Sequence, residues 1–150
     1  MIESIIDTAQ VLNSNSSNLV FTDDLRTRTA NCCGWLQHTN NSPLYKILEG
    51  GLYEVTLNST LTSATIGQVA LGLYQDGILI PSAISIGDIA TAGNVVNVNM
   101  NKKLRVCCKS DTTLSIGSVP TISAGVTGTT ATTTQIPIIT NATFSIKRIS

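Results

Sequence analysis

Hydrophobic and polar side chains alternate along residues 51–60 and again along residues 67–75. The apolar members are Tyr53, Val55 and Leu57 in the first stretch and Val69, Leu71 and Leu73 in the second. A repeat of two residues is typical of a β-strand with one buried face. Asp76-Gly77 follows directly, and this dipeptide favours a tight hairpin turn. The pattern therefore predicts two neighbouring strands, the second folding back on residues 78–80.

Shorter extended stretches with similar patterns are predicted on both sides of this hairpin. They cover residues 19–21, 29–38, 44–48, 83–90, 95–100, 104–109, 113–119 and 142–149. Asn101-Lys102-Lys103 is predicted to form a corner between two of them. The count of about ten short strands, with no convincing helix after residue 18, is typical of an all-β protein. We therefore expect a two-sheet antiparallel jelly-roll sandwich.

Residues 1–18 are predicted to form a short N-terminal arm. Ile2, Ile5 and Ile6 have roughly helical spacing, and a run of Asn and Ser over residues 13–18 ends that pattern. The arm either anchors the protein to something larger or frays as a chain end. Residues 19–150 are expected to form the jelly-roll domain.

A long stretch rich in Gly, Thr and Ala, residues 121–134, is predicted to be a loop. Loops of this length in a small domain are often functional. Thr and Gly supply little area for recognition, however. We therefore expect this loop to move freely or to cover a neighbouring subunit rather than to recognise a partner.

Composition excludes several classes of function. Charged residues make up only 12% of the chain, about half the usual share, whereas there are 21 threonines, 15 serines and 12 asparagines. Nine basic and nine acidic side chains cancel without a large basic cluster, which disfavours binding to nucleic acid. No apolar run approaches the length of about 20 residues that a membrane span needs, and no secretion signal is evident.

The four cysteines occur as two adjacent pairs, Cys32-Cys33 and Cys107-Cys108. Zinc sites usually separate paired cysteine ligands by two to four residues. Without such a spacer, small apolar strand residues are the preferred interpretation, and a metal or redox site is the lesser one. A disulfide between the two pairs is left open, as is the oxidation state of the sulfurs.

Candidate chemistry is sparse. His38 is the only histidine and is predicted to lie on the surface at a strand end. The acidic residues are scattered, mostly at predicted turns, and no phosphate-binding loop is present. We expect no catalytic residue, no metal site and no cofactor, so the sequence predicts that the protein is not an enzyme.

Three motifs support a family resemblance. Residues 51–55 (GLYEV) and 69–77 (VALGLYQDG) resemble the strand signatures of the tumour necrosis factor and complement globular-head superfamily, and residues 142–146 (ATFSI) resemble its last strand. The order of these motifs after residues 19–23 (LVFTD), with residues 106–108 (VCC) before the end, is similar to small structural proteins of bacteriophages of Gram-positive bacteria. Heads of this type also end filaments on bacterial spores.

The resemblance implies a compact homotrimer in which one sheet faces the threefold axis. The candidate interface residues are Tyr53, Glu54, Thr56 and Asn58. It also implies a virion protein, a non-enzymatic knob that decorates a capsid or ends a fibre. Ile2, Ile5 and Ile6 are the candidates for attachment to other virion proteins.

A second hypothesis is a receptor-binding or glycan-binding head on a phage fibre or on a bacterial spore or cell surface. Aromatic residues make up only 4% of the chain, and Tyr45 and Tyr74 are the candidates for stacking on a host-surface glycan. Tyr53 and Trp35 lie in strand patterns that place them in the core or at the trimer axis. The scarcity of exposed aromatic rings favours the structural hypothesis.

Overall fold

The computed structural model describes residues 1–13, 17–27, 34–107, 111–122 and 132–150, and its regular structure is entirely β. The strands are β1 (Ile2–Ile5), β2 (Gln10–Val11), β3 (Asp23–Thr27), β4 (Leu36–His38), β5 (Tyr45–Ile47), β6 (Gly51–Thr62), β7 (Gly67–Gln75), β8 (Ile78–Ile89), β9 (Val95–Val106), β10 (Thr112–Ser118), β11 (Thr121–Ile122), β12 (Thr132–Thr133) and β13 (Ile138–Arg148). Within these ranges no helix is long and apolar enough to cross a membrane.

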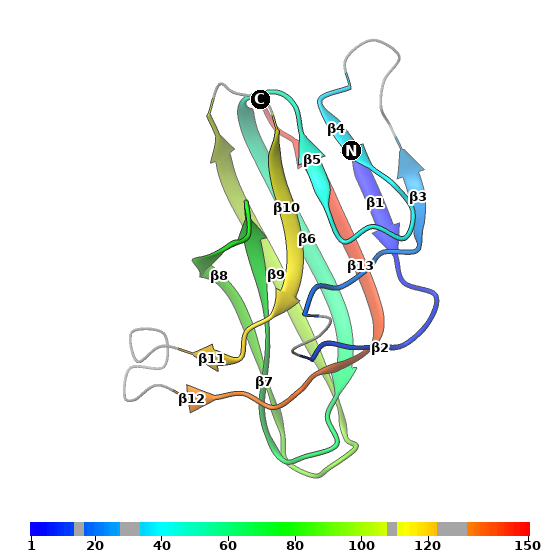
Figure 1. The fold of residues 1–150 in the computed structure, drawn as a ribbon, viewed down its shortest axis with the longest axis vertical. Helices are drawn as coiled ribbons and strands as arrows, with labels where there is room; N and C mark the ends of the chain where they lie inside the picture. The colour runs from blue at the N-terminus through cyan, green and yellow to red at the C-terminus, as the bar shows by residue number, and fades with distance from the viewer. Residues whose placement is uncertain (14–16, 28–33, 108–110, 123–131) are drawn as a thin grey trace.

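Two antiparallel sheets lie face to face (Figure 1). The first, called the β6 sheet, has the order β3-β1-β13-β6-β9, with β2 also paired to β13. The second, called the β7 sheet, has the order β4-β5-β10-β7-β8. Strands β11 and β12 form a separate two-stranded ribbon. The predicted jelly-roll sandwich of about ten strands is confirmed.

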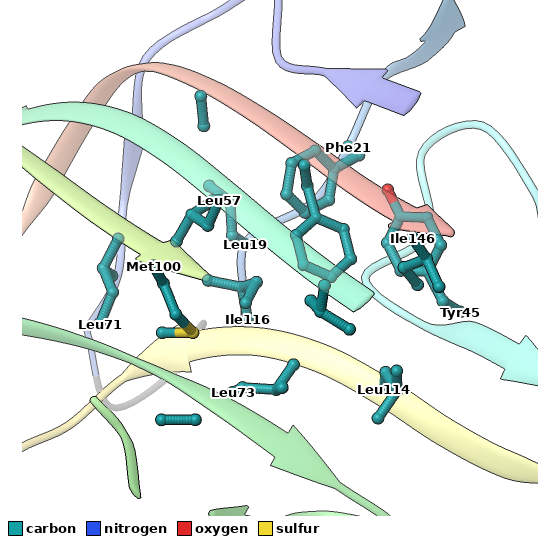
Figure 2. Close-up of a cluster of buried hydrophobic side chains, with 14 of the residues drawn as sticks. Leu19, Phe21, Tyr45, Leu57, Leu71, Leu73, Met100, Leu114, Ile116 and Ile146 are labelled. Atoms are coloured by element: carbon teal, nitrogen blue, oxygen red, sulfur yellow. The ribbon is translucent and has the colours of Figure 1, made fainter. Parts of the chain in front are cut away.

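The core fills the space between the two sheets. Figure 2 shows Leu57, Met100 and Ile146 from the β6 sheet facing Leu71, Leu73, Leu114 and Ile116 from the β7 sheet. The rings of Phe21, Tyr45 and Phe144 pack together near one edge, with centroids 4.9–5.7 Å apart. These side chains are the alternating apolar residues of their strands, so the period of two places them on the inner faces.

The predicted fold-back of residues 67–75 on residues 78–80 agrees with the β7–β8 hairpin, whereas β6, predicted as a neighbour of β7, pairs with β13 and β9 in the opposite sheet. Strand β7 spans the predicted residues 67–75, and β6 runs two residues beyond its predicted end. The backbone angle φ is 51° at Asp76 and 77° at Gly77, the left-handed region that a tight hairpin turn requires at both positions.

The predicted corner at Asn101-Lys102-Lys103 is wrong. These residues pair in register with Thr56, Val55 and Glu54, so β9 runs unbroken over twelve residues. The polar triplet stays extended because β6 offers it a continuous partner strand. The inward-facing Lys102 sits at the open edge of the sandwich, where its ammonium group donates to Ser82 Oγ at 2.7 Å.

Residues 78–80 and 83–90 also belong to one strand rather than two. Pro81 lies inside β8, where a break was predicted. Proline has no N–H donor, but β8 is an edge strand of the β7 sheet. On its open side there is no partner strand to which Pro81 would have to donate.

The prediction of a separate N-terminal arm is wrong for the residues that the structure describes. Strand β1 lies inside the β6 sheet between β3 and β13, and Ile2 pairs with Ile146. Ile2, Ser4 and Ile6 are buried, which is the period of a strand. Because the buried Ser4 is polar, the sequence does not show this period, and the isoleucines alone have a roughly helical spacing.

At the ends of the predicted loop over residues 121–134, strands β11 and β12 pair as a ribbon. Thr121 and Ile122 pair with Thr133 and Thr132, and residues 123–131 lie outside the described residues. Ile122 is fully buried against Ala70 and Val119 in a second apolar cluster. Because Ala70 alternates with the core-facing residues of β7, this cluster lies on the outer face of the β7 sheet.

Candidate functional site

The outer face of the β6 sheet carries the predicted interface residues Glu54, Thr56 and Asn58. They alternate along β6 with buried residues and therefore point away from the core. Neighbouring strands extend this face into polar rows that cross β13, β6 and β9. The rows are Asn141–Thr60–Asn97, Thr143–Asn58–Asn99, Ser145–Thr56–Asn101 and Lys147–Glu54–Lys103.

Hydrogen bonds between side chains fix part of this face. Thr60 Oγ1 donates to Asn97 Oδ1 at 3.0 Å, and Asn101 Nδ2 donates to Thr56 Oγ1 at 3.5 Å. Asn58 between them is exposed. The result is a surface of short hydroxyl and amide groups, able to form hydrogen bonds with a flat partner.

Tyr53, the fourth interface candidate, lies on the other side of β6. Its side chain is fully buried, and its hydroxyl donates to the carbonyl oxygen of Glu49 at 2.6 Å. Its ring packs on the half-buried Trp35 with centroids 5.5 Å apart. Burial raises the pKa of Tyr53. The interface prediction is wrong for this residue because Tyr53 shares the inward parity of Val55 and Leu57.

A buried polar cluster, which we call the edge cluster, consists of Ser4, Asp24, His38 and Tyr45. His38 Nδ1 lies 2.7 Å from Asp24 Oδ1, and the Ser4 hydroxyl donates to the same carboxylate oxygen. His38 Nε2 lies 3.0 Å from the carbonyl oxygen of Ser42. The imidazole ring stacks on Tyr45 at a centroid distance of 4.0 Å.

The prediction of a surface histidine is therefore wrong. The side chain of His38 is 0% exposed because β4 turns it inward to Asp24 of β3, on the opposite sheet. Both ring nitrogens face oxygen atoms of the protein itself and the side chain is buried, so a substrate cannot reach either nitrogen. The cluster joins the two sheets at one edge and offers no reactive group to solvent.

Tyr45 is also misplaced as a glycan-binding candidate. It is 0% exposed, and no sugar reaches its ring. Burial raises its pKa far above the ordinary value, and the charge of Asp24 adds to this effect. The nearby Ser4 hydroxyl opposes this effect on the pKa. In the structure that hydroxyl donates to Asp24, and Tyr45 Oη has no hydrogen-bond partner among the described residues.

Tyr74, the other glycan-binding candidate, lines a pocket of about 470 Å³ on the outer face of the β7 sheet. The fourteen lining residues include no charged side chain. Eight of the fourteen come from residues 12–13, 17–18 and 134–137, which the sequence assigned to an arm and to the end of a loop. Sequence patterns carried no signal for this pocket, because the two segments meet only in the folded chain.

The attachment candidates are dispersed. Ile2 and Ile6 fill the core, so the prediction that they hold a partner is wrong. Ile5 is half-buried and points to the outer face of the β6 sheet, beside Thr143. The role of Ile5 stays a prediction.

Among the described residues there is no cluster of three or more His, Cys, Asp or Glu side chains able to hold a metal ion. Cys107 is an exposed free thiol at the end of β9. The predictions for Cys32, Cys33 and Cys108 concern positions outside the described residues.

The two sheets have the architecture of the tumour necrosis factor and complement globular heads, so the resemblance noted in the motifs is confirmed for the fold. The globular domain of zebrafish complement 1qA protein superposes with a TM-score of 0.67 at 10% identity, covering 99% of this chain and 96% of that chain. The Eiger TNF from S. frugiperda gives 0.66 at 8% identity, covering 99% and 92%. Murine APRIL gives 0.55 at 6% identity, covering 96% of each. No protein-family model and no curated protein matches the chain.

Proposed function

We propose that the protein is a non-enzymatic structural head that assembles as a homotrimer through the outer face of the β6 sheet. The observation that carries the proposal is the set of polar rows across β13, β6 and β9. These three strands are eleven or twelve residues long, so the face they share is broad and continuous.

The chemistry of this face suits self-association. Interfaces between proteins are on average about as polar as the rest of the surface, and hydrogen bonds between short side chains lose little conformational entropy. Thr, Ser and Asn can act as donors and acceptors, so copies of one face can satisfy one another. Glu54, the one carboxylate in the rows across β13, β6 and β9, has Lys103 and Lys147 as its neighbours in register, which gives each copy both signs of charge.

The non-enzymatic assignment rests on where the reactive side chains lie. His38 and Asp24 contact each other in the edge cluster, and their side chains are 0% and 8% exposed. The pocket lined by Tyr74 contains hydroxyls and amides but no carboxylate, amine, imidazole or thiol, and the Tyr74 hydroxyl donates to the carbonyl oxygen of Ser118. Such a lining can bind a ligand, whereas general acid–base chemistry needs a titratable group within reach.

We further propose that this head belongs to a bacteriophage particle, as a capsid decoration or as the head of a fibre, with a bacterial spore or cell surface as the alternative location. The support is the motif order shared with small phage structural proteins, from residues 19–23 through 51–55 to 142–146. Attachment through Ile2 and Ile6 is not part of the proposal, because both residues are buried in the head's own core.

Mass photometry tests the assembly. We expect particles of three times the chain mass of 15.8 kDa. Asn58→Arg should convert them to monomers, since three guanidinium groups would meet around the axis. Gln37→Arg is the matched control, because Gln37 is an exposed amide on β4 of the other sheet. A wild-type monomer, or a trimer that survives Asn58→Arg, would contradict the assembly.

Immunogold labelling of purified phage particles tests the location. Regular labelling at capsid or fibre positions is expected. Labelling restricted to the host cell or spore surface would support the alternative location, and an unlabelled particle would refute the virion assignment.

A further inference from the structure

We infer that the pocket on the outer face of the β7 sheet is a binding site for a neutral saccharide. This inference goes beyond the structural role proposed above and does not depend on trimer formation. It rests on a preformed aromatic surface, on walls held by backbone hydrogen bonds, and on a lining without charge.

The ring of Tyr74 is held in a fixed orientation at the base of the pocket. Tyr74 pairs in register with Ser115 of β10, and its hydroxyl donates to the carbonyl oxygen of Ser118 at 2.7 Å. The ring lies close to Gly117, where a Cβ atom would be 3.1 Å from Tyr74 Cε2. Because position 117 is glycine, the ring can lie down against β10 and remain half-exposed toward the pocket.

The wall formed by residues 17–19 is attached to β10 as an additional partner. Leu19 N–H donates to the carbonyl oxygen of Ile116 at 2.8 Å, and Ser118 N–H donates to that of Ser17 at 2.9 Å. The side chain of Asn18 therefore reaches the pocket from a fixed backbone.

The opposite wall, residues 134–137, is fixed in the same way. Gln135 N–H donates to the carbonyl oxygen of Gln68 at 2.7 Å, and Leu12 N–H donates to that of Pro137 at 3.0 Å. Thr65 Oγ1 donates to Gln135 Oε1 at 2.7 Å. Both walls are thus in place before a ligand arrives, which lowers the entropy cost of binding.

The lining selects the class of ligand. Its polar groups are amides and hydroxyls, and its apolar parts are an aromatic ring, two prolines and aliphatic side chains. The polar groups include those of Asn18, Ser115 and Gln135, and the apolar parts include Tyr74, Pro120 and Leu44. A sugar ring has the complementary surface, with hydroxyls around its rim and C–H groups on its faces. A phosphate, carboxylate or amine would find no counter-charge.

The volume sets the size of the ligand. About 470 Å³ lies within the range of about 300–1,000 Å³ that small-molecule pockets occupy. This space suits one or two sugar rings rather than a folded protein segment. The pocket also lies on the face away from the polar rows of the β6 sheet, so trimer formation through that sheet leaves it open.

Titration of the whole protein by two-dimensional NMR tests the inference. The probes are methyl glycosides of glucose, galactose, mannose and N-acetylglucosamine, the disaccharides lactose and maltose, and sialyllactose as an acidic comparison. We expect saturable shifts of the Gly117 and Ser115 amides with at least one neutral sugar, and weaker binding of sialyllactose than of lactose.

Variants distinguish stacking from general surface effects. Tyr74→Ala should weaken binding by at least about tenfold through loss of the ring. Tyr74→Phe should bind within about threefold of the wild type, since the hydroxyl is engaged by Ser118 rather than by a ligand. Asn18→Ala tests the wall without removing the ring. Gln37→Ala, an exposed amide elsewhere on the same sheet, is the matched control and should bind normally.

Several results would overturn the inference. The first is the absence of saturable shifts with every neutral sugar on the panel, and the second is shifts located away from the pocket. The third is binding that none of the folded variants Tyr74→Ala, Asn18→Ala and Tyr74→Phe weakens. Preferential binding of sialyllactose, or of an unrelated proline-rich peptide titrated in parallel, would assign the pocket to another ligand class and would equally refute it.

Discussion

The edge cluster shows how one hidden pair of side chains can hold two layers together. Asp24 belongs to the β6 sheet and His38 to the β7 sheet, and the 2.7 Å contact between them bridges the layers at one edge. At the opposite edge Ser85 Oγ donates to the carbonyl oxygen of Asn99 at 2.6 Å, joining β8 to β9. The sandwich is therefore closed by polar contacts on both sides of its apolar core.

Removing one member of the edge cluster should be costly. We expect Asp24→Ala to lower the free energy of unfolding by about 3 kcal/mol, because it strands His38 and Ser4 in a buried place without their acceptor. The exposed pair of Lys46 and Asp111, 3.0 Å apart, provides the control. Lys46→Ala should cost less than about 1 kcal/mol. Urea denaturation measures both, and equal losses would contradict this view of the cluster.

Tyr45 should make the fold sensitive to alkali. Burial raises the pKa of Tyr45, so above about pH 10 the unfolded chain releases a proton that the folded chain keeps. Stability is then unaffected by this residue below pH 10 and falls as the pH rises further, by at most about 1.4 kcal/mol per pH unit.

Tyr45→Phe should remove this contribution. At neutral pH the substitution should cost little, because Tyr45 Oη has no hydrogen-bond partner among the described residues. Denaturation at about pH 7 and about pH 11 makes the comparison. A wild type and a variant that lose the same stability at high pH would show that another group is responsible.

Strand β1 makes the first residues part of the head rather than an appendage. Ile2→Ala should destabilise the fold by about 2–4 kcal/mol, since Ile2 is 2% exposed and its loss leaves a cavity. Ile5→Ala on the same strand is the control and should cost less than half as much, because Ile5 is half-buried on the outer face. Thermal unfolding distinguishes them. A truncation of residues 1–18 that still folds and assembles would contradict the assignment.

The strands that could be predicted from sequence are those whose alternation is unbroken. The β7–β8 hairpin could be predicted because the apolar residues of β7 alternate and Asp76-Gly77 ends the pattern, and β6 could be predicted from the same alternation. The prediction divides β9 because Asn101, Lys102 and Lys103 form a polar run in the sequence, although only Lys102 lies on the apolar face of the strand. Strand β1 was missed because the buried Ser4 takes its partner, Asp24, from twenty residues away. Whether such a polar residue lies inside a strand depends on partners distant in sequence, which the local pattern of apolar residues does not reveal.

The same distinction applies to the candidate sites. The outward direction of Thr56 and Asn58 followed from alternation, and the inward direction of Tyr53 and Tyr45 was available from the same rule. Predicting the pocket at Tyr74 requires knowing how residues 12–13, 17–18 and 134–137 come together at the outer face of the β7 sheet. That arrangement depends on the complete fold.

The molecule as a whole has two unlike outer faces. The outer face of the β7 sheet is partly covered by residues 17–19, residues 134–137 and the β11–β12 ribbon. Ile122 of this ribbon is buried against Ala70 and Val119. On the β6 sheet, polar rows cross β13, β6 and β9. The proposed assembly uses the second face and leaves the first, with its pocket, directed outward. One small domain can in this way assemble and bind a ligand without conflict.

The pairing of β1 with β13 also has a consequence for biosynthesis. Ile2 can meet Ile146 only after the residues between them have left the ribosome, so β1 cannot pair with β13 until then. Contacts this distant in sequence also slow folding. During that interval the nascent chain exposes isoleucines that are buried in the folded head. A chaperone that binds apolar segments would protect the chain most in this period.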